Sequence, residues 1–229
     1  MTTFALDTAT PDPALAVLDG DVVIAEAWLG RAPGGGRRIL EATHHLFAMS
    51  GTVPADLREV VVGIGPGGFT GIRIGIATAL GLGQALGIPV HGASTLEALA
   101  LGLIVARRAP AEIIAPVIDA RRHQVFAAAY VADGTVLSEV IAPAAWAPGD
   151  LADALVAAGG AVLGGDGAAL VPLREGVRRA PAGATDRVAA SLLVSRVRAA
   201  GPRPVAPDYL RLPDAEENRL RREREGSAA

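Results

Sequence analysis

The sequence predicts an α/β fold built from two similar lobes, and three observations carry that prediction. The first half reads as three strands followed by alternating helices and strands, an order typical of α/β proteins. The same order, βββαβα, returns in the second half, and an internal repeat predicts a repeated structural unit. An aspartate ends the first strand of each half, Asp7 in one and Asp119 in the other. Two such lobes would face each other across a cleft.

The composition narrows the classes of function. A chain of 229 residues with 51% apolar content can bury one sizeable core or two small ones. A net charge of -3 argues against a protein that holds nucleic acid mainly through its own basic surface. Cysteine and lysine are both absent, which excludes thiolate chemistry, Schiff bases and a P-loop lysine. The amino terminus lacks a signal-peptide pattern and no unbroken apolar run reaches membrane length, so we expect a cytoplasmic protein.

The first lobe is expected to span residues 1–108. Its opening segment, residues 4–29, reads as an antiparallel meander whose last two strands join at the DGD run at 19–21, a strong hairpin signal. Apolar residues at helical spacing predict a helix over 37–50, which Gly51 would end. The run REVVVGIG that follows reads as a buried strand.

The remainder of the first lobe is expected to contain two more helices. One covers 70–86 and is ended by Gly87. A short strand, PVHGAS, leads from it into the other helix, over 95–108, which Ser or Thr would cap. The segment 107–110 is the expected boundary between the lobes.

The second, shorter lobe is expected to span residues 109–229. Residues 113–142 read again as strand, strand, Asp-Gly turn and strand. A helix over 148–158, the strand AVLGG and a helix over 185–199 follow. The chain closes with a run of mixed charge, which we expect to form a solvated or fraying helix.

Residues 63–89 hold nine glycines in the run GIGPGGFTGIRIGIATALGLGQALGIP. A glycine-rich junction between a strand and a helix can bind phosphate, because unpaired N–H groups and the positive end of the helix dipole face the anion. This run matches neither G-x-G-x-x-G with an acidic residue about 20 positions on nor G-x-x-x-x-G-K-[ST]. The pattern therefore does not favour a nucleotide site here.

Small residues recur every four positions along the predicted helix 70–86 and form one slanting row: Gly71, Gly75, Ala79, Gly83 and Gly87. Each interior glycine destabilises a helix by about 0.5–1 kcal/mol relative to alanine. The row therefore indicates that another backbone comes close. That backbone belongs either to a helix of the same chain or to another subunit, and we favour another subunit.

Several motifs together resemble the bacterial TsaB (YeaZ) family in order and spacing. They are DTAT at 7–10, GIGPGGFTGIRIGIATALGLG from Gly63, STLEAL at 94–99, IDAR at 118–121 and PDYLR at 207–211. The resemblance covers nearly the whole chain. It implies the fold of the sugar kinase, Hsp70 and actin superfamily (ribonuclease H-like), whose duplicated lobes agree with the internal repeat.

The resemblance also implies a function without catalysis. TsaB is the noncatalytic partner of its paralogue TsaD, which transfers threonylcarbamoyl from its adenylate to N6 of the adenosine next to the tRNA anticodon. TsaE, an ATPase, joins the two. By this resemblance, ATP or ADP with Mg²⁺ belongs to the complex and not to this chain, and tRNA is contacted only through the complex.

The resemblance places the docking of TsaD on the helices expected over 37–50 and 70–86, the surface that carries the glycine row. The expected interface residues are Ile39, Thr43, Gly71, Ile72, Gly75, Ile76, Ala79 and Gly83. A homodimer through the same face would compete with TsaD. Two departures from the family pattern are the run GGGRR at 34–38, where relatives carry a histidine followed by Ser or Thr, and Gly68, where serine is common.

An alternative interpretation makes the chain an autonomous ATP-dependent phosphotransferase of the same fold. Asp7, Thr8 and Thr10 would then hold a magnesium nucleotide at the end of the first strand. We favour the interpretation that they tie the first turn, and no catalytic residue can be singled out. A metal site is not expected either, because His44 and His45 are adjacent on a helix and not four residues apart. Neither H-E-x-x-H nor G-x-S-x-G occurs.

Overall fold

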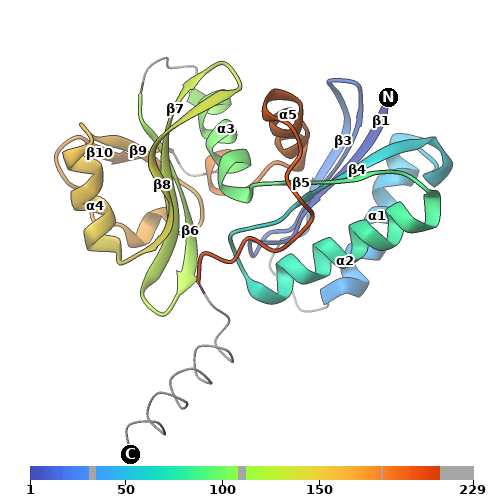
Figure 1. The fold of residues 1–229 in the computed structure, drawn as a ribbon, viewed down its shortest axis with the longest axis horizontal. Helices are drawn as coiled ribbons and strands as arrows, with labels where there is room; N and C mark the ends of the chain where they lie inside the picture. The colour runs from blue at the N-terminus through green and yellow to red at the C-terminus, as the bar shows by residue number, and fades with distance from the viewer. Residues whose placement is uncertain (31–34, 108–111, 182, 212–229) are drawn as a thin grey trace, which may run out of the picture.

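The computed structural model describes residues 1–30, 35–107, 112–181 and 183–211, which fold into two five-stranded sheets with helices against them (Figure 1). The layers follow one another in the order α1 and α2, first sheet, α3 and α5, second sheet, α4. The charged run predicted to form a fraying helix, residues 212–229, lies outside the described residues. The helices are α1 (Gly35–Ser50), α2 (Phe69–Leu86), α3 (Thr95–Arg107), α4 (Pro148–Ala157) and α5 (Ala190–Ala200).

The first sheet has the strand order β3-β2-β1-β4-β5. Its strands are β1 (Thr2–Asp7), β2 (Ala14–Asp19), β3 (Val22–Trp28), β4 (Leu57–Gly63) and β5 (Val90–Ala93). β1, β2 and β3 are antiparallel neighbours, and β4 and β5 continue the sheet in parallel with β1. Gly20 takes a positive φ of 57° in the β2–β3 turn, a conformation that glycine adopts without strain. The predicted meander is thus confirmed.

The second sheet repeats this topology with the order β10-β9-β6-β7-β8. Its strands are β6 (Ile114–Arg121), β7 (Gln124–Asp133), β8 (Val136–Trp146), β9 (Ala161–Gly164) and β10 (Val177–Arg179). Antiparallel pairs join β6, β7 and β8, and parallel pairs join β6, β9 and β10. The internal repeat read from the sequence is therefore confirmed at the level of strand order and direction.

The second repeat departs from the first where the counterpart of α2 would stand. A three-residue 3₁₀ helix, Ala168–Leu170, follows β9 in its place. β10 was not expected from the sequence, because its three residues include two exposed arginines and so lack an apolar pattern. The helix predicted over 185–199 begins only at Ala190, because Ala184–Asp186 forms a separate 3₁₀ turn.

The two halves of the chain exchange packing partners. α3, from the first repeat, packs on β6, β7 and β9 of the second sheet, whereas α5, from the second repeat, packs on all five strands of the first sheet. Residues 202–211, which we call the strap, also return to the first sheet: Arg203 pairs with Gly92 of β5, and the Asp208 N–H donates to the Ile64 carbonyl at 2.8 Å. The predicted division into 1–108 and 109–229 is therefore wrong for 95–107, which pack on the second sheet, and for 190–211, which return to the first.

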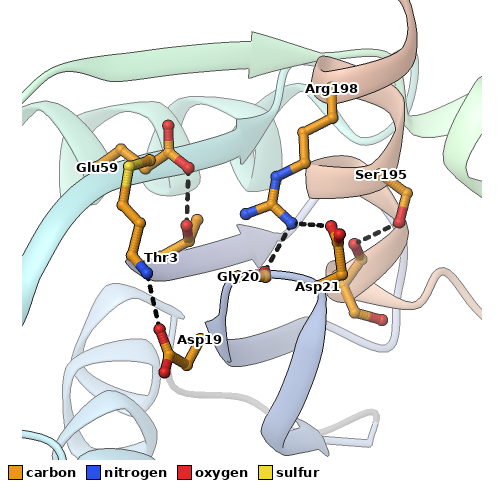
Figure 2. A network of polar contacts seen from close by, with 9 residues as sticks. Thr3, Asp19, Gly20, Asp21, Glu59, Ser195 and Arg198 are labelled. Atoms are coloured by element: carbon orange, nitrogen blue, oxygen red, sulfur yellow. Dashed lines mark hydrogen bonds and ion pairs between the residues drawn. The ribbon is translucent and has the colours of Figure 1, made fainter.

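Figure 2 shows how α5 is held against the first lobe. Arg198 donates to the Gly20 carbonyl at 2.6 Å and also binds the carboxylate of Asp21 in the β2–β3 turn. On the neighbouring strands, the Thr3 hydroxyl donates to Glu59 at 2.7 Å. The Arg198 contacts join α5 to a turn more than 170 positions away and help to hold the end of the second repeat against the first sheet, on which the whole helix packs.

Among the described residues, one helix, α2, is long and apolar enough to cross a membrane by length and hydropathy. It packs against β4, β1 and β5. Only 28% of its residues are buried, so much of its apolar surface faces away from the sheet. The residues exposed on this side of α2 therefore determine what the first lobe can bind there.

Candidate functional site

A cleft of about 610 Å³ lies between the two lobes. Its walls come from the turn after β1, the loop before α2 with the first turn of that helix, the end of β6, and the strap. All four segments carry motifs that stand out in the sequence, namely DTAT, the glycine-rich run, IDAR and PDYLR. The repeat topology therefore brings distant motifs to one place.

Asp7 stands behind the cleft and does not line it. Its side chain is fully buried, with one oxygen accepting the Ala9 N–H at 2.9 Å and the other accepting the Thr95 hydroxyl at 2.7 Å. A Cβ on Gly63 would come within 1.9 Å of the same carboxylate. This geometry favours the interpretation that Asp7 ties the β1 turn to the start of α3, because both oxygens already accept hydrogen bonds.

Burial raises the pKa of Asp7 above its ordinary value of 3.8, against the opposing effect of the hydrogen bonds from Thr95, Ala9 and Thr10. A carboxyl whose pKa is higher in the folded state binds its proton more tightly there than in the unfolded state. Its contribution to the free energy of unfolding is therefore fully present below pH 3.8, the ordinary pKa. That contribution is lost as the pH rises through the raised pKa.

We expect Asp7→Asn to remove this fall in stability, measured as the difference between the urea unfolding curves of variant and parent across the acidic range. Parallel pH profiles of the two proteins would contradict it.

Thr8 and Thr10 do line the cleft. The Thr8 hydroxyl donates to the Gly71 carbonyl at 2.6 Å, which ties the β1 turn to the first turn of α2. The Thr10 hydroxyl makes a longer contact, 3.4 Å, with the Asp12 carbonyl. Of the predicted nucleotide residues, these two reach the cleft and Asp7 does not.

The wall from the second lobe is built around Asp119. Its carboxylate accepts the Arg121 N–H at 2.7 Å and the Arg121 guanidinium at 2.9 Å. The GGDG run at 164–167 packs directly against the backbone of β6. A Cβ on Gly165 would lie 2.2 Å from the Val117 carbonyl oxygen, and a Cβ on Gly167 would lie 2.7 Å from the Asp119 nitrogen. These glycines serve the close approach of the chain's own backbone.

The strap forms a wall that was not assigned from the sequence. Tyr209 stacks on Phe69 at the start of α2, with ring centroids 5.2 Å apart. Arg73 lies 3.7 Å above the Phe69 ring and donates to the Tyr209 hydroxyl at 2.9 Å. At its other end, Arg211 donates to Gln124 of β7 at 2.9 Å. The strap thus contacts both lobes across the mouth of the cleft.

The predicted interface residues face inward, which corrects the expectation from the sequence. Seven of the eight are buried within the chain: Ile39, Thr43, Ile72, Gly75, Ile76, Ala79 and Gly83. The eighth, Gly71, abuts the β1 turn, where a Cβ would lie 2.0 Å from the Thr8 carbonyl oxygen. The row does mark a close backbone approach, but the approaching backbone is the chain's own. The prediction that these positions meet another subunit is wrong.

A second row of small residues lies on the opposite, exposed face of α2. Ala77, Gly81 and Ala85 recur every four positions there, and a Cβ on Gly81 would meet nothing within 4 Å. Beside this row Leu80 is 45% exposed. We call this exposed row, together with Leu80, the outer helix face. The neighbouring helix α1 also exposes Leu40 and Met49, to 62% and 81%, but they are nine residues apart and lie on opposite sides of that helix.

The described residues contain no group of three or more His, Cys, Asp or Glu side chains close enough to hold a metal ion. His44 and His45 lie on α1 with ring centroids 6.1 Å apart in an edge-to-face arrangement. His91 lies 3.6 Å from Glu59, which also accepts the Thr3 hydroxyl.

Comparison with known proteins gives consistent matches. A family model described as TsaD, tRNA N6-adenosine threonylcarbamoyltransferase, matches residues 36–166. The tRNA threonylcarbamoyladenosine biosynthesis protein TsaB of Bacillus subtilis is 36% identical over 141 residues, which cover 62% of this chain and 60% of that protein. An uncharacterized protein of Mycobacterium tuberculosis is 37% identical over 221 residues, which cover 93% of each.

The fold comparison agrees with these matches. YeaZ from Pseudomonas aeruginosa superposes with a TM-score of 0.74 and 26% identity, covering 91% of this chain and 99% of that one. The expected α/β fold with two similar lobes is therefore confirmed. Motifs, lobe topology and relatives agree, and the chain belongs to the TsaB (YeaZ) family.

Proposed function

We propose that this chain is the noncatalytic partner of TsaD in the synthesis of N6-threonylcarbamoyladenosine in tRNA, and that it docks through the outer helix face. The observation that carries the proposal is the exposed side of α2, where Ala77, Gly81 and Ala85 form a row of small side chains beside Leu80, although the other side of the helix already packs on the first sheet. The names of its TsaB relatives support the pathway.

The outer helix face has the properties of a helix-packing surface. Small side chains at Ala77, Gly81 and Ala85 leave room for a foreign helix to approach closely, and Leu80 supplies an adjacent apolar knob. A row of small side chains next to an exposed leucine is the surface that close helix packing uses, so a helical partner fits this surface better than solvent does.

The geometry of the cleft supports a noncatalytic role for this chain beside TsaD. In this chain Asp7 is used to hold the turn, and its carboxylate oxygens already accept the Thr95 hydroxyl and the Ala9 N–H. We infer that TsaD supplies the residues that act on threonylcarbamoyl-adenylate, whereas this chain supplies a surface that stabilises TsaD in its active form. TsaE and ATP with Mg²⁺ would enter at the level of the complex.

An autonomous phosphotransferase is the second candidate, and the cleft volume of about 610 Å³, within the usual range for ligand pockets, favours it. The burial of Asp7 and the packing of GGDG on β6 both weigh against it. Turnover of ATP by the purified chain distinguishes the two candidates. A noncatalytic partner is expected to show negligible turnover with Mg²⁺ and ATP, whereas a phosphotransferase would show a Mg²⁺-dependent rate.

Docking through the outer helix face can be tested with Gly81→Arg. The substitution places a long charged side chain on the exposed row without meeting any atom of its own chain, because nothing lies within 4 Å of the Cβ position. We expect TsaD affinity to fall at least about 100-fold, about 2.7 kcal/mol, in isothermal titration calorimetry, with a melting temperature that is no lower than that of the parent. Any homodimer formed through the same face should dissociate in sedimentation experiments.

A matched control is Val156→Arg on the outer side of α4, where another exposed apolar residue, 41% accessible, lies on the other lobe. This variant should bind TsaD like the parent. Unchanged TsaD affinity of a folded Gly81→Arg variant would rule out docking through this face.

A further inference from the structure

Three arginines gather at the mouth of the cleft, which stands out in a chain whose net charge is -3. Arg121 and Arg122 come from the turn between β6 and β7, and Arg211 comes from the strap. We call these residues the arginine rim. The carboxylates that also line the cleft are Asp119, which is already bound to Arg121 at 2.9 Å, and Asp208.

The turn that carries two of these arginines has an unusual sequence for its backbone. Arg121, Arg122 and His123 all have positive φ, at 61°, 51° and 60°. The tight turns of the β2–β3 and β7–β8 hairpins use glycine for this conformation, Gly20 at 57° and Gly134 at 60°. Glycine adopts the left-handed backbone conformation without strain, whereas residues that have a Cβ adopt it at an energetic cost. The backbone conformation of this turn favours glycine, so the presence of two arginines and a histidine indicates that their side chains have a role.

Arg211 is positioned beside this turn by contacts with β7. Its guanidinium donates to Gln124 at 2.9 Å and lies 5.9 Å from the centroid of the Phe126 ring. Gln124 pairs with Arg121 across the hairpin. The strap and the turn thus present cationic groups to the same side of the cleft, and Arg122 at the turn is exposed to solvent.

We propose that the arginine rim binds phosphate groups of the RNA backbone, so that this chain contacts tRNA directly on a surface separate from the outer helix face. Arginine suits this ligand because its planar guanidinium donates paired hydrogen bonds to phosphate oxygens. Elsewhere the chain carries no net basic field, so a polyanion is drawn to this local patch.

An RNA backbone fits the cleft better than a nucleotide does. The glycine run that borders the second-lobe wall packs directly on β6, with the Cβ position of Gly167 only 2.7 Å from the Asp119 nitrogen. That backbone leaves no slot for an adenine base between the run and the strand. The arginines instead lie at the entrance, on a turn and a strap that both face solvent, where a strand of phosphates can pass.

The test uses the isolated full-length chain and a fluorescein-labelled, unmodified tRNA transcript, titrated by anisotropy at several salt concentrations. The parent should bind with an affinity that falls steeply with salt. Arg122→Gln/Arg211→Gln should weaken binding at least about tenfold and reduce the slope of log K against log salt by about 1.5, roughly 0.7–0.9 for each phosphate that the variant no longer binds. Arg122→Lys/Arg211→Lys, which keeps both charges, should retain most of the affinity.

The matched control is Arg58→Gln/Arg174→Gln, which removes the same charge elsewhere. Arg58 is the second residue of β4 and does not line the cleft, and Arg174 pairs with Asp153 beside β10. This variant should bind tRNA within about twofold of the parent, because nonspecific charge effects are spread over the surface. Melting temperatures and TsaD affinity, measured on the same samples, report folding and docking independently of RNA binding.

Four results would overturn the proposal. One is the absence of tRNA binding at low salt, and a second is equal losses in the rim and control variants. Another is stoichiometric binding of Mg²⁺-ATP that displaces tRNA, which would make the cleft a nucleotide site. The last is binding of polyglutamate as tightly as tRNA at equal charge, which would point to an acidic protein segment. Loss of RNA binding in the rim variant alone, with polyglutamate and ATP ineffective, supports the proposal whether or not TsaD docks on the outer helix face.

Discussion

Gly71→Ala is expected to lower the free energy of unfolding by about 2–3 kcal/mol, because a single methyl group would overpack a rigid contact. The added Cβ would stand 2.0 Å from the carbonyl oxygen of Thr8, a backbone atom that cannot rotate away. The helix would have to shift from the β1 turn, which would also lengthen the hydrogen bond from the Thr8 hydroxyl to the Gly71 carbonyl. Urea denaturation followed by circular dichroism measures the change.

The control for this experiment lies on the same helix. Gly81→Ala adds the same methyl group where nothing lies within 4 Å, so it should raise stability by about 0.5–1 kcal/mol through helix propensity alone. The opposite signs of the two substitutions distinguish the inward from the outward row. Two similar, small effects would show that α2 is not seated against the β1 turn as described.

The second large effect is expected from Glu97→Gln in α3. Glu97 is a nearly buried carboxylate, 8% exposed, that joins three parts of the chain. It accepts hydrogen bonds from Arg196 of α5 at 3.0 and 3.3 Å and from Arg203 of the strap at 2.9 Å. Removing the charge leaves Arg196, 14% exposed, without its counterion in a region of low dielectric constant. We expect the free energy of unfolding to fall by about 3 kcal/mol, within the range for breaking a buried ion pair.

A surface ion pair provides the comparison. Arg37 and Glu41 on α1 are 2.8 Å apart, but their side chains are 87% and 55% exposed. Glu41→Gln should change stability by less than about 0.5 kcal/mol, because water and salt screen exposed pairs. Hydrogen exchange of the strap amides should accelerate in Glu97→Gln only. A loss confined to α3, with the strap still protected, would contradict the role of Glu97 as the junction.

Much of the fold followed from the sequence. Alternating apolar residues, the glycine at 20 and the glycine at 134 predicted both meanders, and helical periodicity with Gly87 predicted α2 to within one residue. What the pattern could not supply was the exchange of partners by α3 and α5. Each helix has an apolar stripe that fits either sheet, and the choice depends on distant contacts such as those of Arg198 with the β2–β3 turn.

The candidate interface shows a second limit of pattern reading. Two rows with four-residue spacing run along α2, one through Gly75 and one through Gly81, and both contain small residues. The spacing predicts close approach but does not name the approaching backbone. The row with more glycines was expected to face outward, whereas the structure uses those glycines to seat the helix on its own sheet.

The cleft was only partly foreseen. Asp7, Thr8 and Thr10 after β1 were identified as candidates, whereas Asp119 at the end of β6 was recognised only as the counterpart of Asp7 in the repeat. The strap was grouped with the charged run that follows it, since prolines and mixed charges give no periodic signal. Its ordering depends on Phe69, Arg73 and Gly92, contacts that lie more than 100 positions away in the sequence.

The exchange of partners by α5 also bears on synthesis. The strands of the first sheet are complete once residue 93 has left the ribosome, but the helix that shields one side of them, Ala190–Ala200, emerges about 100 residues later. During that interval the nascent chain carries an uncovered apolar layer, a state that chaperones bind and that favours aggregation. Translation of the second repeat is therefore part of the maturation of the first.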